Sequence, residues 1–342
     1  MDIKAVIKMH LDRYPLMEVR DGVKLLYQRC FAGGHMISDL SACLERAEVE
    51  MADAAPEFIS PDALGNGLAR LHLSSARAAG LSAESVGRAF AATANSFSPQ
   101  REQFLEELDA LAEFFPDGDE FVEKYKASGC PALHHSEGFA EKYRPAYRVV
   151  RQAHCLMVKA AAAIEKLPGD KVLIAVDGPC GGGKSTLSEA LGEMLDANVF
   201  HCDDFFLRPE QRTPSRYETP GGNVDHERIL EEIILPLRRG ETPCPRKFDC
   251  STMTLTEGGE YPEKRINILE GSYSLHPMLR EHIDLALWTD VSPETQLRRL
   301  SLRTGDTDAF VRKWIPLENT YFAAFSVKES ADLIISNEED FI

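Results

Sequence analysis

Residues 177–186, DGPCGGGKST, form a glycine-rich segment between an apolar run and a helical pattern. The apolar run VLIAV at 172–176 has the length and branched side chains of a buried strand. From Gly178 onward the segment fits the pattern G-x-x-x-x-G-K-[ST], whose glycines let successive backbone N–H groups turn inward onto phosphate oxygens. The N-terminus of the helix expected over 184–195 favours the same anion. This order of strand, loop and helix predicts an α/β fold with an anion site where the strand ends.

The same segment predicts binding of a nucleoside triphosphate. Lys184 would reach the β- and γ-phosphates, and the Ser185 hydroxyl would hold Mg²⁺. A match to the four constrained positions arises by chance in about 1% of such chains, taking glycine at ~7%. The alternative is a glycine-rich turn with a surface lysine. The residues expected to bind the nucleotide are Gly178, Cys180, Gly181, Gly182, Gly183, Lys184, Ser185 and Thr186.

Two other expected strands end in acidic residues. The run 199–202 is followed by Asp203 and Asp204, and an acid beside the phosphate loop can accept the proton of an acceptor hydroxyl. Either aspartate could face the γ-phosphate, and both could instead cap a turn. The strand 266–269 ends in Glu270, for which Mg²⁺ is a natural partner, a helix N-cap being the alternative.

Arginines gather on a helix expected over 293–303, where Arg299 and Arg303 are spaced i,i+4. On a hinged segment they could close over a transferring phosphoryl group. A solvated charged face is the alternative. Asp225 precedes another amphipathic helix, and we weigh capping of that helix against substrate binding.

The tetrapeptide LPGD at 167–170 marks the expected domain boundary, since proline and glycine interrupt regular structure. Residues 1–166 read as a mostly α-helical domain of unknown role, with its last helix over 145–166. Residues 167–342 alternate strands with helices, which indicates a parallel sheet. Arg144, Arg148 and Arg151 would share one face near the start of that last helix and could hold an anion or form a solvated face.

The net charge of −17 divides into −5 before Pro168 and −12 after it. Such a chain should repel nucleic-acid polymers and anionic membranes, so a local cluster of donors must hold any bound phosphate. No apolar run approaches the ~18 residues that a membrane span needs. The eight cysteines form no C-x-x-C pair, which favours reduced thiols and a cytoplasmic location. A homodimer is compatible with all of this.

Residues 171 to about 337 carry an ordered series of motifs: Gly178–Ser185, DDFF at 203–206, NVDH at 223–226, KFD at 247–249, EGSY at 270–273 and the arginines at 298–303. With these motifs the region resembles the uridine kinase and phosphoribulokinase branch of the P-loop kinases, which also contains bacterial pantothenate kinase. The resemblance implies a five-stranded parallel sheet flanked by helices. It also implies that Asp203 is the base, that Glu270, Ser185 and Asp203 lie at the Mg²⁺, and that lid arginines contact phosphates.

The acceptor side departs from the uridine kinase pattern. Phe206 replaces a tyrosine, Phe248 replaces another, and the histidine expected shortly after Asp249 is absent. Because lost donors change specificity, ATP-dependent phosphorylation of a small-molecule hydroxyl is better supported than uridine as acceptor. A sugar, a glycerate-like acid, a pantothenate-like alcohol and an ATP-sensing regulatory module stay open. The residues implied for the acceptor are Phe206, Asp225, His226, Asp249 and Tyr273, with Asp203, Lys184, Arg299 and Arg303 as the catalytic group.

Overall fold

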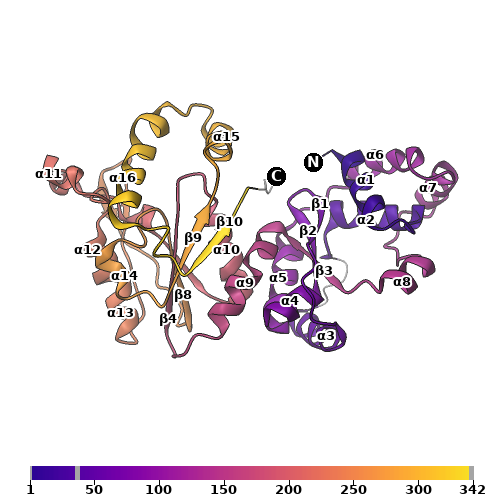
Figure 1. The fold of residues 1–342 in the computed structure, drawn as a ribbon, viewed down its shortest axis with the longest axis horizontal. Coiled ribbons are helices and arrows are strands. Elements are labelled where there is room, and N and C mark those ends of the chain that lie inside the picture. Colours follow the sequence, from indigo (N-terminus) through magenta and orange to yellow (C-terminus); the bar gives the residue numbers. More distant parts are fainter. Residues whose placement is uncertain (1, 35–38, 339–342) are drawn as a thin grey trace. The chain divides into compact units, whose positions relative to one another are not determined.

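The computed structural model describes residues 2–34 and 39–338, and the chain divides into two compact units (Figure 1). The first unit ends at Ala162 and the second begins at Ala163, four residues before the boundary expected from LPGD. Each unit has its own apolar core. No helix among the described residues is both long and apolar enough to span a membrane.

The first unit combines helices with a small antiparallel sheet of order β1-β2-β3. Asp2, Asp39, Ser82 and Ser136 cap four of its helices with side-chain oxygens, as short polar residues before an apolar run commonly do. The elements are α1 (Ile3–Arg13), α2 (Val19–Phe31), α3 (Leu40–Asp53), β1 (Asp62–Gly65), β2 (Leu68–His72), α4 (Leu73–Ala79), α5 (Ala83–Ser96), α6 (Arg101–Leu108), a 3₁₀ turn (Asp109–Glu113), α7 (Gly118–Ala127), α8 (Glu137–Tyr143), β3 (Tyr147–Arg151) and α9 (Gln152–Glu165).

The prediction of a helix over 145–166 is wrong for its first residues. Residues Tyr147–Arg151 form strand β3, which pairs antiparallel with β2, Val150 lying opposite Ala69. The apolar spacing of Val149 and Val150 fits a helix, but β-branched side chains also suit a strand, and the pairing partner lies some eighty residues away. The arginines therefore do not share a helix face.

The second unit is a five-stranded parallel sheet of order β10-β9-β4-β8-β5 with helices around it, which confirms the predicted fold class. Strands β4 and β8 are buried along their whole length, as expected for central strands covered on both faces. Its main elements are β4 (Val172–Asp177), α10 (Lys184–Leu195), β5 (Asn198–His201), α11 (Pro214–Glu218), α12 (His226–Ile229), α13 (Leu235–Arg238), β6 (Lys247–Asp249), β7 (Thr254–Thr256), β8 (Ile266–Glu270), α14 (Pro277–Arg280), β9 (Leu285–Asp290), α15 (Pro293–Thr304), α16 (Ile315–Phe325) and β10 (Leu333–Ser336).

Pro316 does not end its helix. A π turn over Phe310–Trp314 leads directly into α16, because Ile315 N–H bonds to the carbonyl of Phe310 five residues back. A wider turn relieves the clash of a proline ring with the preceding turn. The continuous helix carries Trp314 and Glu318 to the cavity described next.

Candidate active site

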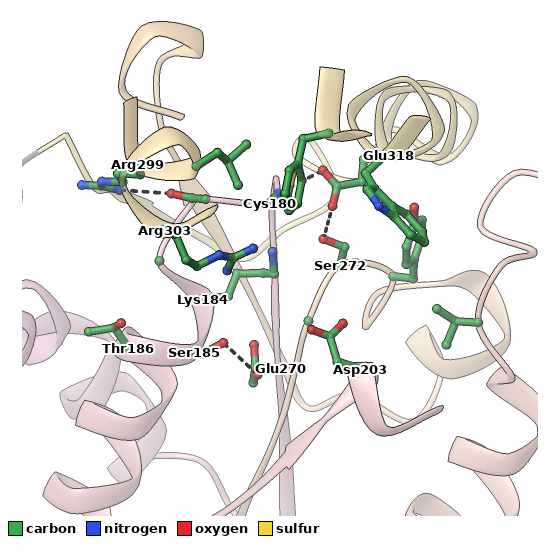
Figure 2. A pocket seen from close by; sticks show the side chains of 18 of the residues that line it. Cys180, Lys184, Ser185, Thr186, Asp203, Glu270, Ser272, Arg299, Arg303 and Glu318 are labelled. Carbon is green, nitrogen blue, oxygen red and sulfur yellow. Dashed lines mark hydrogen bonds between the residues drawn. The ribbon is translucent and has the colours of Figure 1, made fainter. Parts of the chain in front are cut away.

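A cavity of about 510 Å³ opens where strands β4, β5 and β8 end (Figure 2). Glycine conformation shapes the loop on one side of it. Gly178 has φ +147°, and a Cβ there would lie 2.3 Å from Thr289 Oγ1. Gly183 has φ +84° and caps α10, so the first N–H groups of that helix are presented to the cavity side. The loop therefore has the form expected for an anion cradle.

Lys184 is largely buried within the loop and lines the cavity. Its Nζ donates to the carbonyl oxygens of Gly178 at 2.9 Å and Pro179 at 3.0 Å. On the outside of the loop, Gln296 donates to the Cys180 carbonyl at 2.8 Å and Asn337 donates to that of Gly182 at 2.9 Å. These contacts occupy four carbonyl groups of the loop. The N–H groups of Gly178, Cys180 and Gly182 also donate within the protein, so the N–H groups at the start of α10 are the ones that a ligand would use.

The two adjacent aspartates after β5 have different surroundings. Asp203 lines the cavity, whereas Asp204 forms an ion pair with Lys247 at 2.8 Å. Loss of water contact raises the pKa of Asp203; Lys184 opposes this rise and Glu270 adds to it. Asp203 is therefore the aspartate that faces the phosphate loop.

Glu270, at the end of β8, lies beside the loop. Its Oε1 accepts from Ser185 Oγ at 3.1 Å and contacts His201 Nδ1 at 2.6 Å. This hydrogen bond to Glu270 raises the pKa of His201 despite partial burial. No group of three or more His, Cys, Asp or Glu side chains that could hold a metal occurs in residues 2–34 and 39–338. Any metal here would therefore need oxygen ligands from a bound molecule as well.

Arg299 and Arg303 of α15 both line the cavity, as their spacing predicts. The Arg303 guanidinium lies 5.6 Å from the ring centroid of Phe310, and Arg299 donates to the Gly181 carbonyl at 3.4 Å. Figure 2 shows Lys184, Arg303, Asp203 and Glu270 around one space. The arrangement combines an anion cradle with the cationic side chains of Lys184, Arg299 and Arg303 and with the carboxylates of Asp203 and Glu270.

Sequence reasoning missed Glu318 of α16, which is only 5% exposed and lines the cavity. Its two oxygens accept from Cys180 N–H at 2.9 Å and Ser272 Oγ at 2.7 Å (Figure 2). Burial together with the Glu318 charge raises the pKa of the Cys180 thiol to about 12. A lone glutamate in a helix gives no sequence signal, because only tertiary packing brings it to the loop.

Asp177, also missed, is fully buried at the end of β4. It accepts from Gly178 N at 2.7 Å, Leu275 N at 3.0 Å and Tyr321 Oη at 2.9 Å. These bonds tie the start of the phosphate loop to the turn after β8 and to α16. In that turn Tyr273 has φ +79°, an uncommon conformation for a bulky residue that the Asp177 contacts support.

The remaining wall of the cavity is aromatic and apolar, built from Phe206, Val224, Tyr273, Phe310 and Trp314. The rings of Phe206 and Trp314 lie 6.1 Å apart, centroid to centroid. Asn223 adds one amide to this wall. Of the acceptor residues implied by the resemblance, the structure brings Phe206 and Tyr273 to the cavity.

Asp225, His226 and Asp249 do not line the cavity. Asp225 is fully buried and caps α12, its Oδ1 accepting from Arg228 N at 3.3 Å. His226 is buried and stacks on His276 with centroids 3.9 Å apart. Asp249 accepts from Ser251 in an exposed turn. The structure thus shows Asp225 capping α12, which was the alternative to substrate binding.

The stacked histidines predict acid sensitivity of the second unit. Burial lowers the pKa of His226 well below 6.5 and that of His276 to about 4. Both imidazoles are neutral in the fold, so the unfolded chain binds more protons between about pH 6.5 and 4, and stability falls as pH falls through that window. After allowing for solvent screening of His276, we expect a loss of about 2 kcal/mol, measured by denaturant unfolding at pH 7 and pH 4.5. His276→Phe should keep the stack and reduce the pH dependence; an unchanged dependence would contradict the prediction.

Comparison with known proteins gives sequence relatives for part of the chain. No family model matches the chain. Uridine-cytidine kinase C of Dictyostelium discoideum is 23% identical over 138 residues, which is 38% of this chain and 29% of that protein. Uridine kinase of Ligilactobacillus salivarius is 28% identical over 140 residues, 37% of this chain and 64% of that protein. The matched region thus spans less than two thirds of either relative.

Among solved structures, a possible uridine kinase from Bacillus stearothermophilus is 17% identical, with a TM-score of 0.43, and the match covers 54% of this chain and 99% of that one. The five-stranded parallel sheet and the phosphate loop give the second unit a P-loop kinase-like fold. Over part of its length the chain is similar to proteins of the uridine kinase branch, at low identity.

Proposed function

We propose that this chain is an ATP-dependent kinase that transfers the γ-phosphoryl group to a hydroxyl of a small molecule. The observation that carries the proposal is the presence of Asp203 in the same cavity as Lys184, with Asp204 paired elsewhere. An ATPase or a nucleotide switch needs the phosphate loop, but it has no need of a carboxylate positioned for an acceptor hydroxyl. The lack of any C-x-x-C pair in the sequence fits the cytoplasm as its compartment.

The nucleotide would be held by the N–H groups at the start of α10 and by Lys184. Ser185 Oγ and a Glu270 oxygen, a hydroxyl and a carboxylate, are the donor types that Mg²⁺ prefers, and they lie 3.1 Å apart. When bound there, Mg²⁺ would neutralise charge on the phosphates. His201 fixes the orientation of Glu270 through the 2.6 Å contact. These residues position the triphosphate with its terminal phosphorus toward the acceptor side.

Asp203 would accept the proton of the acceptor hydroxyl as the oxygen attacks phosphorus. Burial raises the pKa of Asp203, which makes its carboxylate a stronger base than an ordinary aspartate. Lys184, Arg299 and Arg303 would stabilise the charge spread over the transferring group. We assign Asp203 the role of base rather than that of metal ligand, because Ser185 and Glu270 contact each other beside the loop.

The acceptor side favours an uncharged molecule. The aromatic wall offers a flat apolar surface, and Glu318 places a buried negative charge on the cavity in addition to those of Asp203 and Glu270. Three carboxylates repel an acid but accept hydrogen bonds from hydroxyl groups. A nucleoside, sugar or other polyol therefore fits better than a glycerate-like or pantothenate-like acid.

A screen of ADP release over a panel of nucleosides, sugars, polyols and hydroxy acids tests the proposal. We expect turnover stimulated by at least one neutral acceptor. Stoichiometric ATP binding without acceptor-stimulated turnover across the panel would overturn it and favour the ATP-sensing module.

Glu318→Gln should relax discrimination against acidic acceptors. Glutamine can keep the bond from Cys180 N–H through its oxygen and donate its amide to Ser272 Oγ, so the loop should stay in place. Removing the charge should raise kcat/KM for a carboxylate-bearing alcohol relative to a neutral one by about tenfold, or about 1.4 kcal/mol. An unchanged ratio of the two kcat/KM values would show that Glu318 only anchors the loop.

A further inference from the structure

The first unit contains a network of buried polar groups that has no role in the proposed kinase reaction. Asp21, Asp62 and Arg70 are 1%, 3% and 2% exposed, although charged residues rarely lie so deep without a specific reason. This network of buried polar groups links α1, α2, β1 and β2 with the segment before α8 and with β3.

Hydrogen bonds connect these groups in series. Arg70 Nε donates to Gln28 Oε1 at 2.9 Å, and Gln28 Nε2 donates to Tyr147 Oη at 3.1 Å. Tyr147 Oη lies 2.7 Å from His135 Nε2, and His135 Nδ1 donates to Asp21 at 2.7 Å. Burial lowers the pKa of His135, which favours the neutral imidazole and a Tyr147 hydroxyl that donates to it. The network holds Arg70 and Tyr147 in set positions.

Arg70 makes one side-chain hydrogen bond with the described residues, through Nε. Its Nη1 lies 3.9 Å from Asp62, beyond hydrogen-bond distance, and neither Nη group donates to any residue in the described ranges. Asp62 is engaged by Arg13 at 2.7 Å and by Tyr14 Oη at 2.9 Å. The Arg70 guanidinium lies 4.7 Å from the centroid of the Tyr147 ring, a cation–π contact that leaves its Nη donors available to an acceptor.

Arg70 lines a cavity of about 280 Å³ in the first unit. A second cavity of about 190 Å³ shares Pro145 and Tyr147 with it. His72, 9% exposed, also lines the larger cavity, and its Nε2 lies 3.4 Å from Asp62 without hydrogen-bond geometry or another partner among the described residues. At about 30 Å³ per water-sized group, the larger cavity holds a ligand of roughly nine heavy atoms.

The charges around the two cavities are unbalanced. Their lining contains one acid, Glu50, which is paired with Arg148 at 2.6 Å. Arg144, at the larger cavity, is exposed and makes no ion pair with any described residue. Burial, together with repulsion from Arg70, lowers the pKa of Lys24 to about 8, which reflects the local positive potential. The basic lining residues are Arg13, Lys24, Arg70, Arg144 and Arg148, within a chain of net charge −17.

We propose that the larger cavity of the first unit binds a small organic anion, whose phosphoryl or carboxylate group is held by Arg70, Arg144 and His72. Arginine presents a planar pair of donors that matches either group. The rings of Tyr14, Tyr143 and Tyr147 line the same cavity and would enclose the organic part of the ligand. This site is independent of the phosphate loop in the second unit.

The test is calorimetric titration of the full chain carrying Lys184→Met, so that anion binding at the phosphate loop is weakened. The probes are phenyl phosphate, phenylacetate and benzyl alcohol, which share an aromatic body and differ in charge. We expect saturable binding of at least one of the two anions, weakened at least tenfold by Arg144→Ala. Phenyl phosphate or phenylacetate as the tighter probe would identify the group recognised.

Arg46→Ala, a change of an exposed arginine on α3 that lines neither cavity, is the matched control and should leave binding unchanged. Arg70→Met tests the buried donor, with thermal unfolding to establish that the variant folds. Absence of saturable anion binding, equal binding of benzyl alcohol, or equal binding by the Arg144→Ala and Arg46→Ala chains would overturn the proposal. Because Arg144 is exposed, its variant is expected to fold even if Arg70→Met does not.

Discussion

Asp203→Asn is expected to lower kcat for phosphoryl transfer by about 10²–10⁴-fold while ATP still binds. Asparagine has the same shape but cannot take the proton of the acceptor hydroxyl, and general-base catalysis typically contributes a factor of that size. The phosphate loop does not depend on Asp203, so the Kd for ATP should change by less than about threefold. In the unmodified enzyme, activity should fall on acidification at a pH above the ordinary aspartate value, because the base must be ionised and its pKa is raised.

Asp204→Asn is the matched control, because the two residues are adjacent and the same atoms change. Asp204 is engaged by Lys247 at 2.8 Å in a partly exposed ion pair, whose loss should cost at most about 1 kcal/mol of stability. We expect its kcat to stay within about threefold of the unmodified enzyme. If Asp203→Asn transferred phosphate at a near-normal rate and Asp204→Asn did not, Asp204 and not Asp203 would be the base. If both variants transferred phosphate at normal rates, neither aspartate would act as the base.

The phosphate loop could be predicted because its information is local. The strand, the glycines at positive φ and the first turn of α10 are contiguous in sequence, and the conformation that each glycine needs excludes most other residues. The parallel sheet followed from the alternation of strands and helices. Asp203 and Asp204 could not be told apart, because their difference is set by Lys247, more than forty residues away.

Tertiary packing explains what the sequence left out. Glu318 contacts the loop only because α16 packs against it. Asp177 precedes Gly178 in sequence, but its other partners, Leu275 and Tyr321, reach it only in the folded structure. Nothing in the neighbouring residues distinguishes either acid from a surface or capping acid. The error at 145–166 has the same origin. Over so short a run, Val149 and Val150 fit the apolar spacing of a helix as well as that of a strand. Hydrogen bonding with β2 stabilises the strand.

Lys184→Met is expected to reduce phosphoryl transfer by about 10²–10³-fold and to weaken ATP binding. Methionine keeps the unbranched stem inside the loop but removes the positive charge that would stabilise the transferring group. The loop should keep its shape, because both carbonyls that Lys184 contacts have other partners. Ser272 Oγ donates to Gly178 O at 3.1 Å, and Gly182 N donates to Pro179 O at 2.9 Å. The loss is therefore attributable to charge and not to collapse of the loop.

Lys171→Met serves as the control because Lys171 immediately precedes β4 and pairs with Glu263 at 2.9 Å in an exposed ion pair. It removes one lysine charge from the opposite end of the same strand, so ATP binding and kcat should stay close to those of the unmodified enzyme. The measurements are ADP release with the acceptor found in the screen and calorimetric titration with ATP, alongside thermal unfolding of both variants. Equal activity of the Lys184→Met and Lys171→Met chains would mean that the glycine-rich loop does not bind the transferred phosphate. A drop confined to Lys184→Met, with unfolding temperatures that agree, would tie the reaction to this one ammonium group.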